Sequence, residues 1–283
     1  VKGISRLGYY DVMDFAGYNA ANGFLPVLPS AWLRAFMGWS KTINARPNSQ
    51  GEFEFELPRA GSCGNDIVRI DISPSEHLLV ENRQRSAQKN GNIKIELDNK
   101  SVEIPVDSLH LMFQDSVCND KGTDCKINKR KAKGIITNID SYDAALPASG
   151  VAIWHVNDWV LRETLKYNAV NLWSGDAFRD YHFGISLLEA DGIPSIGKEF
   201  KNALGQPAFD YGSGADLLPH IRKGDTVNNL KTQGYTNSAT TFGAYSGIEV
   251  SVSPMTKTTE KTANSFLGDS VINWRSAAMK VKV

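Results

Sequence analysis

The spacing of hydrophobic positions along this chain changes near residue 50. Before that point, apolar residues recur at the spacing of an α-helix that starts after Ser30, a good N-cap, and ends at Gly38. One face of this helix would carry Ala31, Trp32, Ala35, Phe36 and Trp39. The pattern therefore predicts a short helix whose apolar face is buried.

Beyond residue 50, apolar and polar residues alternate with a period of two, which is typical of half-buried strands. The segments with this alternation are 52–57, 66–72, 76–82, 92–97 and 101–106, and the last two predict a hairpin. Residues 150–156 are continuously apolar, as expected for a central strand, and Asp158 then N-caps a helix to about Lys166. The inward side chains of this helix would be Val160, Leu161 and Leu165. Further strands are predicted at 183–190, 247–253 and 278–283.

These elements predict an α+β, β-rich fold in which antiparallel sheets dominate. The segment 43–50 is a plausible boundary between residues 1–48, with helical and loop character, and residues 49–283, a β-rich region packed against them. Residues 191–246 are rich in Gly, Asn, Ser and Pro, with only a short helical pattern at 215–218. Long stretches without periodicity are usually functional or ligand-stiffened loops.

Composition narrows the class of protein without identifying it. Apolar residues make up 41% and charged residues 22% of the 283 positions, which is typical of a globular domain. Lys and Arg total 31, as do Asp and Glu, so there is no basic surplus for a nucleic-acid partner. No apolar run approaches the ~20 residues that a membrane span needs. The chain opens on Val1 without an initiator Met, and we expect a cut inside a longer protein.

Cysteine spacing suggests where the protein works. Cys118 and Cys125 flank a polar loop with a Gly at its tip, and six intervening residues can close a small disulfide loop. A disulfide favours an oxidising compartment, and so a secreted or extracellular protein. Two free thiols, or a metal bound by the pair, are the alternatives. Cys63 would remain unpaired.

Several sequence blocks together resemble one enzyme family. Asp11-Val12-Met13-Asp14 is followed by a Gly/Asn-rich loop and a Trp-containing helix. This stretch resembles the segment just after the zinc-binding helix in secreted metallopeptidases of the immune-inhibitor-A-like family. Blocks in the same order as in that family follow at 79–84, 143–157, 185–192 and 246–250.

The resemblance implies zinc-dependent hydrolysis of proteins outside the cell. In such sites zinc lowers the pKa of a bound water toward ~7, a Glu takes its proton, and two His one helical turn apart bind the metal. No His-Glu-x-x-His occurs in this chain, so none of those residues can be carried over. Met13 falls where the family has its methionine turn under the metal, with a packing role. Asp11 and Asp14 would hold that turn through side-chain hydrogen bonds to the backbone.

Other side chains offer weaker candidate chemistry. No two of the five histidines lie within five residues of each other, and His155, on the apolar strand, is the best candidate for a role near a site. A structural histidine is the alternative there. The histidines are His77, His110, His155, His182 and His220.

Acidic residues at a strand end and in the following loops suggest a calcium site. Glu189, Asp191 and Asp216 are the candidate ligands, because calcium takes six to eight oxygens, often from loop carboxylates. Turn-forming Asp residues are the alternative interpretation. Further loop carboxylates are Asp176, Asp180 and Asp210, and a second candidate group is Asp115, Asn119, Asp120 and Asp124.

The favoured function is the C-terminal portion of a secreted zinc-dependent endopeptidase, inactive alone, whose intact form would act on proteins or peptides. It predicts an exposed apolar surface near residues 1–40. A degenerate family member without the zinc helix is one alternative. Another is a non-catalytic β-rich binding or adhesion module, with Trp154, Trp159, Trp173 and Trp274 as a stacking platform or as core. No Gly-x-Ser-x-Gly, Gly-x-Gly-x-x-Gly or Walker sequence occurs.

Overall fold

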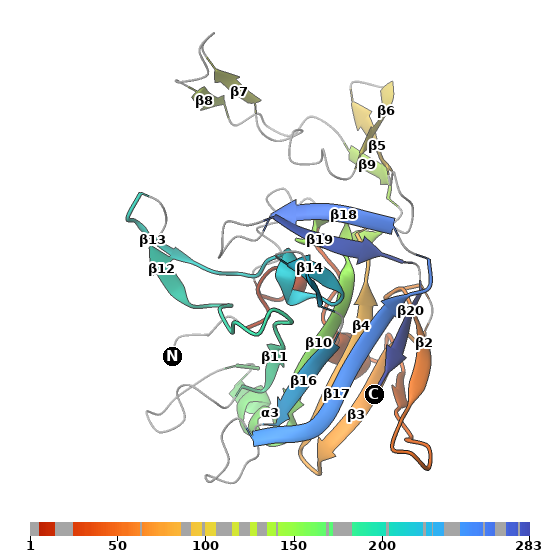
Figure 1. Cartoon of the computed structure of the whole chain (residues 1–283). Coiled ribbons are helices and arrows are strands. Elements are labelled where there is room, and N and C mark those ends of the chain that lie inside the picture. Colours follow the sequence, from red (N-terminus) through yellow and green to blue (C-terminus); the bar gives the residue numbers. More distant parts are fainter. Residues whose placement is uncertain are drawn as a thin grey trace.

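The fold is built from antiparallel sheets with a few short helices, as a computed structural model of the chain shows (Figure 1). The structure describes residues 6–14, 25–62, 64–85, 92–97, 100–105, 115–118, 125–128, 135–139, 141–167, 170–171, 183–201, 204–222, 225–227, 229–234, 244–256, 258–263, 270–276 and 278–283. The predicted β-rich, α+β class is confirmed at this level.

A five-stranded sheet forms the centre of the molecule. Its strand order is β1 (Thr42–Asn44), β3 (Ile67–Ser73), β4 (Glu76–Arg83), β10 (Gly150–Asn157) and β11 (Ile185–Leu187). All pairs are antiparallel except β1 with β3. Every residue of β4 and β10 is buried, because both faces of the sheet are covered. The continuous apolar run at 150–156 therefore predicted a central strand correctly.

A four-stranded sheet covers one face of the central sheet. Its order is β16 (Asn229–Gly234), β17 (Ala244–Pro254), β20 (Ala278–Lys282) and β2 (Glu54–Pro58), and Figure 1 shows it in front of β10, β4 and β3. The hydrophobic core between the two sheets includes Leu57, Leu78, Val80, Ile153, Val250, Val252, Met279 and Val281. Alternate residues of β4 and β10 thus point into this core.

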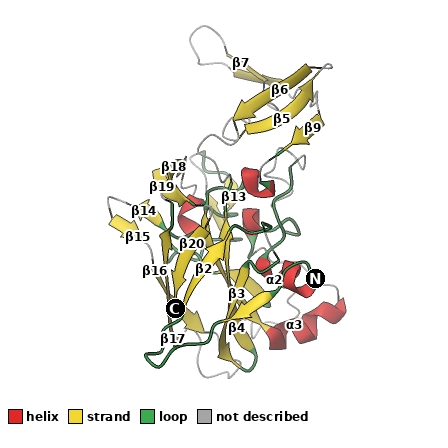
Figure 2. Cartoon of the chain, turned by 90° about the vertical axis from the view of Figure 1, so that its right-hand side faces the viewer, coloured by secondary structure: helices red, strands yellow, loops and turns green. Residues whose placement is uncertain are grey.

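The other face of the central sheet is covered by helices and by the N-terminal segment. α2 (Ala31–Phe36) and α3 (Asp158–Thr164) lie on one side of β3 and β4 (Figure 2), and the 3-10 turn η1 (Gly8–Tyr10) contributes to the same core. Residues that meet there include Leu7, Tyr10, Ala31, Ile67, Leu79, Trp154, Leu161 and Ile185. This core contains residues from both sides of position 48, and the division at 48 stays a prediction.

Smaller sheets complete the described part of the chain. They are β15 (Asp225–Val227), β14 (His220–Arg222), β19 (Ser270–Arg275) and β18 (Thr258–Ala263); β12 (Glu199–Lys201) with β13 (Pro207–Phe209); β6 (Lys100–Pro105), β5 (Asn92–Leu97) and β9 (Ile135–Asn138); and β7 (Asp115–Cys118) with β8 (Cys125–Asn128). Three further 3-10 turns are η3 (Tyr142–Ala145), η4 (Leu165–Tyr167) and η6 (Gly214–Asp216). Among the described residues, no helix is long and apolar enough to cross a membrane.

Three sequence predictions about helices need correction, of which the third concerns Leu165 at the surface near α3. In α2, Ser30 is the N-cap as expected, but Phe36 and Trp39 are 62% and 61% exposed while Arg34 is buried. The helix turns a charged side chain toward the sheet because buried carboxylates there pair with it. In α3, Asn157 rather than Asp158 is the N-cap, since its side chain accepts from the amides of Trp159 and Val160.

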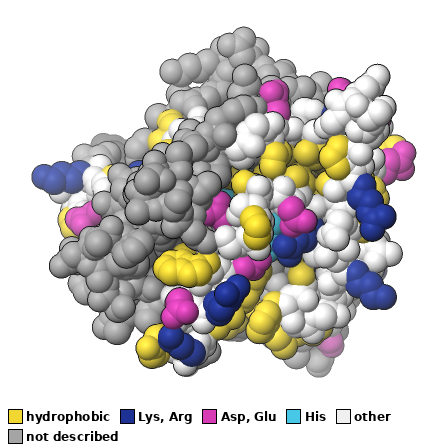
Figure 3. All heavy atoms as spheres, turned by 90° about the horizontal axis from the view of Figure 1, so that it is seen from below, with side chains coloured by type: hydrophobic (Ala, Val, Ile, Leu, Met, Phe, Trp, Pro, Cys, Tyr) yellow, Lys and Arg dark blue, Asp and Glu magenta, His cyan; other side chains and the backbone are white. Residues whose placement is uncertain are grey.

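The lower end of the molecule in Figure 1 carries α3, and its surface is partly apolar. Trp159, Leu165 and Tyr167 are exposed there, so the inward placement expected for Leu165 is wrong. Figure 3 views the molecule from this end and shows hydrophobic side chains among Lys, Arg, Asp and Glu. Leu165 follows the last residue of α3 and belongs to η4, so the helical period no longer directs it inward.

Candidate functional site

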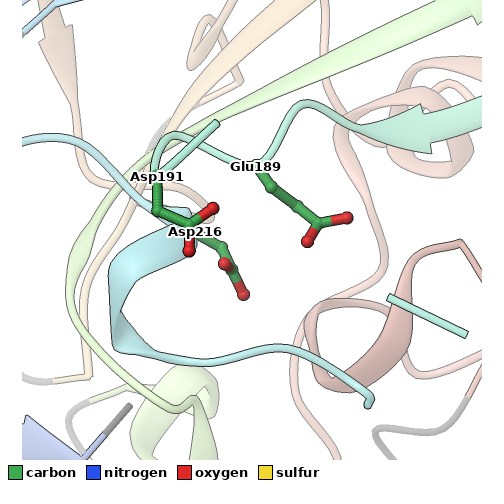
Figure 4. Close-up of side chains that lie close together, drawn as sticks. All are labelled: Glu189, Asp191 and Asp216. Atoms are coloured by element: carbon green, nitrogen blue, oxygen red, sulfur yellow. The ribbon is translucent and has the colours of Figure 1, made fainter. Parts of the chain in front are cut away.

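Three carboxylates converge beside the central sheet. The ligand oxygens of Glu189, Asp191 and Asp216 all lie within 4.8 Å of one another (Figure 4). Glu189 and Asp191 follow β11, and Asp216 ends η6. We call these three residues the acidic cluster. It unites the three calcium candidates that the sequence suggested, although 25 positions or more separate Asp216 from the other two.

Backbone amides hold Glu189 and Asp191 in place. Glu189 Oε2 accepts hydrogen bonds from the Ser195 amide at 2.7 Å and the Ser195 hydroxyl at 3.0 Å, and its Oε1 accepts from the Ile196 amide at 3.1 Å. Asp191 Oδ1 accepts from the Ile193 amide at 2.8 Å. The loop after β11 therefore folds around these carboxylates. An ionised carboxylate has about four acceptor positions, of which these hydrogen bonds occupy two on Glu189 Oε2 and one on Oε1.

Asp216 is held in place by a capping box with Ser213, the N-cap of η6. The Asp216 carboxylate accepts from the Ser213 amide, and the Ser213 hydroxyl accepts from a backbone amide of η6. The backbone carbonyl of Asp216 accepts from the Ala190 amide at 3.2 Å, which joins η6 to the loop of Glu189. Asp210 adjoins the group, because its Oδ2 accepts from the Ser195 hydroxyl at 3.0 Å. Of the other carboxylates suggested by sequence, Asp176, Asp180, Asp120 and Asp124 lie outside the described residues, as does Asn119.

Burial and mutual repulsion alter the acidity of the cluster. Burial, aided by the negative charge of Asp191, raises the pKa of Glu189 to about 7, although the hydrogen bonds from Ser195 and Ile196 lower it in part. Burial and then Glu189 raise the pKa of Asp216 well above its usual value. A group of oxygen-only ligands with excess negative charge is suited to a hard divalent cation such as calcium. The geometry fits the ligand chemistry, while calcium itself stays a prediction.

The methionine-turn residues have the hydrogen bonds expected from sequence. Asp11 Oδ1 accepts from the Met13 amide at 2.7 Å, and its Oδ2 accepts from the Ser30 amide at 2.9 Å. Asp14 Oδ2 accepts from the amides of Leu7 and Gly8, both at 2.9 Å. The two carboxylates thereby close the turn and tie it to the start of α2. Met13 itself is 75% exposed and points away from the core of this chain.

Tyr10 joins the turn to the acidic cluster. It is fully buried, and its hydroxyl contacts the Ser213 carbonyl and lies 3.4 Å from Asp216 Oδ2. Burial and the nearby Asp216 raise the pKa of Tyr10 well above its usual value, so the hydroxyl stays protonated and donates. No sequence pattern pointed to Tyr10, because the contact spans more than 200 positions.

The three histidines that the structure describes do not form a zinc site. His155 is buried on β10 with its Nε2 3.6 Å from Glu76 Oε2, and His77 Nδ1 lies 3.2 Å from Asp158 Oδ2. His220 is buried, with Nδ1 3.1 Å from the Leu217 carbonyl. His110 and His182 lie outside the described residues. Within the described part of the chain, the acidic cluster is the one group of three close metal-type ligands, and it contains no histidine. The residues present therefore do not fit the zinc site that the resemblance implies.

The remaining candidates are placed as follows. Trp154 is fully buried and its Nε1 donates to Glu81 at 2.8 Å, so it belongs to the core rather than to a stacking platform. Trp159 is 42% exposed, and Trp173 and the side chain of Trp274 lie outside the description. Cys118 and Cys125 face each other directly in the register of β7 and β8, a backbone arrangement compatible with the expected disulfide. Cys63 is not among the described residues.

No family model, curated protein or solved structure matches this chain. Function is therefore argued from the residues and their geometry.

Proposed function

We propose that this chain is the part of a secreted zinc-dependent endopeptidase that follows the zinc-binding helix. The observation that carries the proposal is the turn at Asp11–Asp14, in which both carboxylates bond backbone amides and Met13 projects outward. A methionine side chain held on a fixed turn gives a soft apolar floor for a metal site. The turn has the residue types and the internal hydrogen bonds that the resemblance implies.

Exposed apolar side chains in the N-terminal part of the chain, which contains this turn, support the proposal. Met13, Phe36, Met37 and Trp39 are each at least half exposed, with values of 75%, 62%, 50% and 61%. Single exposed apolar residues are common, but a contiguous exposed apolar patch often marks a surface that a partner or another part of the protein covers. Phe36, Met37 and Trp39 follow one another closely at the end of α2. Here the covering part would carry the zinc ligands, and proteins or peptides would be the substrates. By itself the chain should bind no catalytic zinc and hydrolyse nothing.

The test compares the chain with the full-length protein from which we propose it comes. We expect the full-length protein to hold one zinc per molecule and to cleave an unfolded protein substrate, with activity lost on chelation. The chain alone should do neither. A full-length protein without zinc and without hydrolysis would contradict the proposal and leave the degenerate relative or the binding module as the explanation.

A second candidate role is calcium binding at the acidic cluster, favoured by the three carboxylates within 4.8 Å. We expect calcium to raise the free energy of unfolding by about 3 kcal/mol when its concentration is ~100 times the dissociation constant. Asp216→Asn should abolish the effect, whereas Glu163→Gln should retain it, because Glu163 is exposed and pairs with Lys166. Titration calorimetry with calcium checks this, and an absence of binding heat and stabilisation would rule the role out.

A further inference from the structure

Arg83 is an unusual residue for the middle of a protein. It ends β4 with no exposed surface, and its five N–H groups all have acceptors. Nε and Nη2 donate to Asp143 Oδ2 and Oδ1 at 2.6 and 2.7 Å, as a bidentate pair. Nη1 also donates to Glu81 Oε1 at 3.0 Å. These contacts offset the burial of the positive charge and fix the plane of the guanidinium.

The two remaining N–H groups reach the backbone on either side of the methionine turn. Nη1 donates to the Tyr10 carbonyl and Nη2 to the Leu28 carbonyl, each at 3.0 Å. Asp143 Oδ1 in turn accepts from the Leu28 amide at 3.0 Å. One planar side chain therefore sets the distance between the residue before Asp11 and a residue close to Ser30.

The distance between the Tyr10 and Leu28 carbonyls matters for the turn, because Asp11 accepts hydrogen bonds both within the turn and from the start of α2. Asp11 Oδ1 accepts from the amide of Met13, which lies in the chain between Tyr10 and Leu28. Its Oδ2 accepts from the amide of Ser30, two positions after Leu28. Arg83 also acts on Asp11 electrostatically: burial raises the pKa of Asp11, and the positive charge of Arg83 lowers it in part. The positive charge of Arg83 thus favours the carboxylate form of Asp11, which accepts from both amides.

We propose that Arg83 is the positioning residue of the methionine turn, holding Met13 in its outward place through the carbonyls of Tyr10 and Leu28. This inference rests on the proposed function for its importance in catalysis, but its geometry does not depend on peptidase activity. A lysine cannot replace Arg83, because one ammonium group cannot make a bidentate pair and reach two carbonyls at once. Arg34 offers a matched control: it is buried, and its side chain donates to Ser40, Asp66 and Glu81 rather than to the carbonyls of Tyr10 and Leu28.

The experiment follows the methyl signals of the chain's five methionines by NMR, with labelled methyl groups and Met13→Leu for assignment. Met279 lies in the core between the two sheets and reports on the fold as a whole. In Arg83→Lys we expect the Met13 signal to shift and the Met13 and Ser30 amides to exchange at least 10-fold faster, with Met279 unchanged. Arg34→Lys should leave the Met13 signal in place.

Asp143→Asn provides a second variant in case Arg83→Lys does not fold, because it weakens the same clamp while keeping its shape. It should reproduce the selective change at Met13. An unchanged Met13 signal in either folded variant would overturn the inference, as would an equal shift in Arg34→Lys. Loss of the Met279 signal in both Arg83→Lys and Asp143→Asn would also overturn it, since Arg83 would then hold the whole core. None of these results depends on hydrolysis, so failure of the proposed peptidase function is recognised separately.

Discussion

At the scale of single residues, buried carboxylates differ in acidity according to their neighbours. Burial raises the pKa of Glu189 to about 7, where the nearest charges are other carboxylates. Burial would also raise the pKa of Glu81, but Arg83 and Arg34 outweigh it and lower that pKa below its usual value. Glu81 is therefore ionised at neutral pH, while Glu189 is partly protonated unless a cation is bound.

The raised pKa of Glu189 predicts that the free energy of unfolding depends on pH. Its pKa in the folded chain lies above the usual 4.5, so its stabilising contribution is full below about pH 4.5 and is lost as the pH rises through 7. The shift corresponds to about 3 kcal/mol. Urea unfolding in chelator between pH 4 and 8 measures it. The loss should be smaller by about that amount in Glu189→Gln, because the part that belongs to Asp216, whose pKa is also raised, remains. Equal pH profiles for variant and parent would refute the assignment.

At the scale of one element, α2 has its buried and exposed faces arranged by charge. Ala31 and Arg34 face the sheet, where Arg34 donates to Asp66 at 2.6 Å and pairs with Glu81. Phe36 and Trp39 are turned outward. The helix is anchored by the two ion pairs of Arg34 together with Ala31 and the partly buried Trp32, and the exposed Phe36 stacks on Trp32.

Substitutions of the buried Arg34 in α2 and of the exposed Trp39 beyond the end of α2 should therefore have different consequences. Arg34→Met leaves two buried carboxylates with less compensation and should cost about 3–5 kcal/mol of unfolding free energy. Trp39→Ser should change that energy by less than about 0.5 kcal/mol, yet reduce the binding of a hydrophobic fluorescent dye to the chain. Urea unfolding and dye titration of the same samples check both. A large stability loss in Trp39→Ser would show that the aromatic face is packed.

At the scale of the whole molecule, β4 and β10 belong to two cores at once. Leu78 and Leu79 are neighbours on β4, and the first lies in the core between the sheets while the second lies under the helices. Both are almost completely buried. Because one strand carries both cores, the cores should unfold together.

Leu78→Ala and Leu79→Ala test this shared dependence as a matched pair. Each removes the same group from a buried site and should destabilise the chain by about 2–5 kcal/mol. Tryptophan fluorescence and far-UV circular dichroism should give one common urea midpoint for each variant. Two separated transitions, or a change confined to one variant, would show that the cores are independent.

Local patterns predicted the longer strands well and the short ones poorly. Strict alternation at 52–57 placed β2, because a period of two is visible within six residues. The strands β3, β4 and the β5–β6 hairpin also lie where short strand-like segments predicted them. Residues 191–246 were expected to be mostly loop, yet β12, β13, β14, β15 and β16 lie there. Most of these strands have only three residues, too few to show a period.

The residues of the candidate sites, like the strands, were predicted only in part. Sequence singled out Glu189, Asp191 and Asp216 as possible ligands and Asp11 and Asp14 as turn-forming residues, and the structure brings the first three together. No sequence pattern indicated Tyr10 or Arg83, because the importance of these two residues comes from contacts with distant residues. The zinc, calcium and peptidase assignments stay predictions.

The sequence by itself determined the β-rich class, the central strand at 150–157 and the Ser30 cap, because each depends on neighbours within a few residues. Only the tertiary structure decided which face of α2 is buried, which carboxylates meet, and that Arg83 donates to the carbonyls of Tyr10 and Leu28. Those outcomes depend on segments far apart in the chain, and burial makes the pairing of their charges obligatory. Local periodicity carries no information about such pairs.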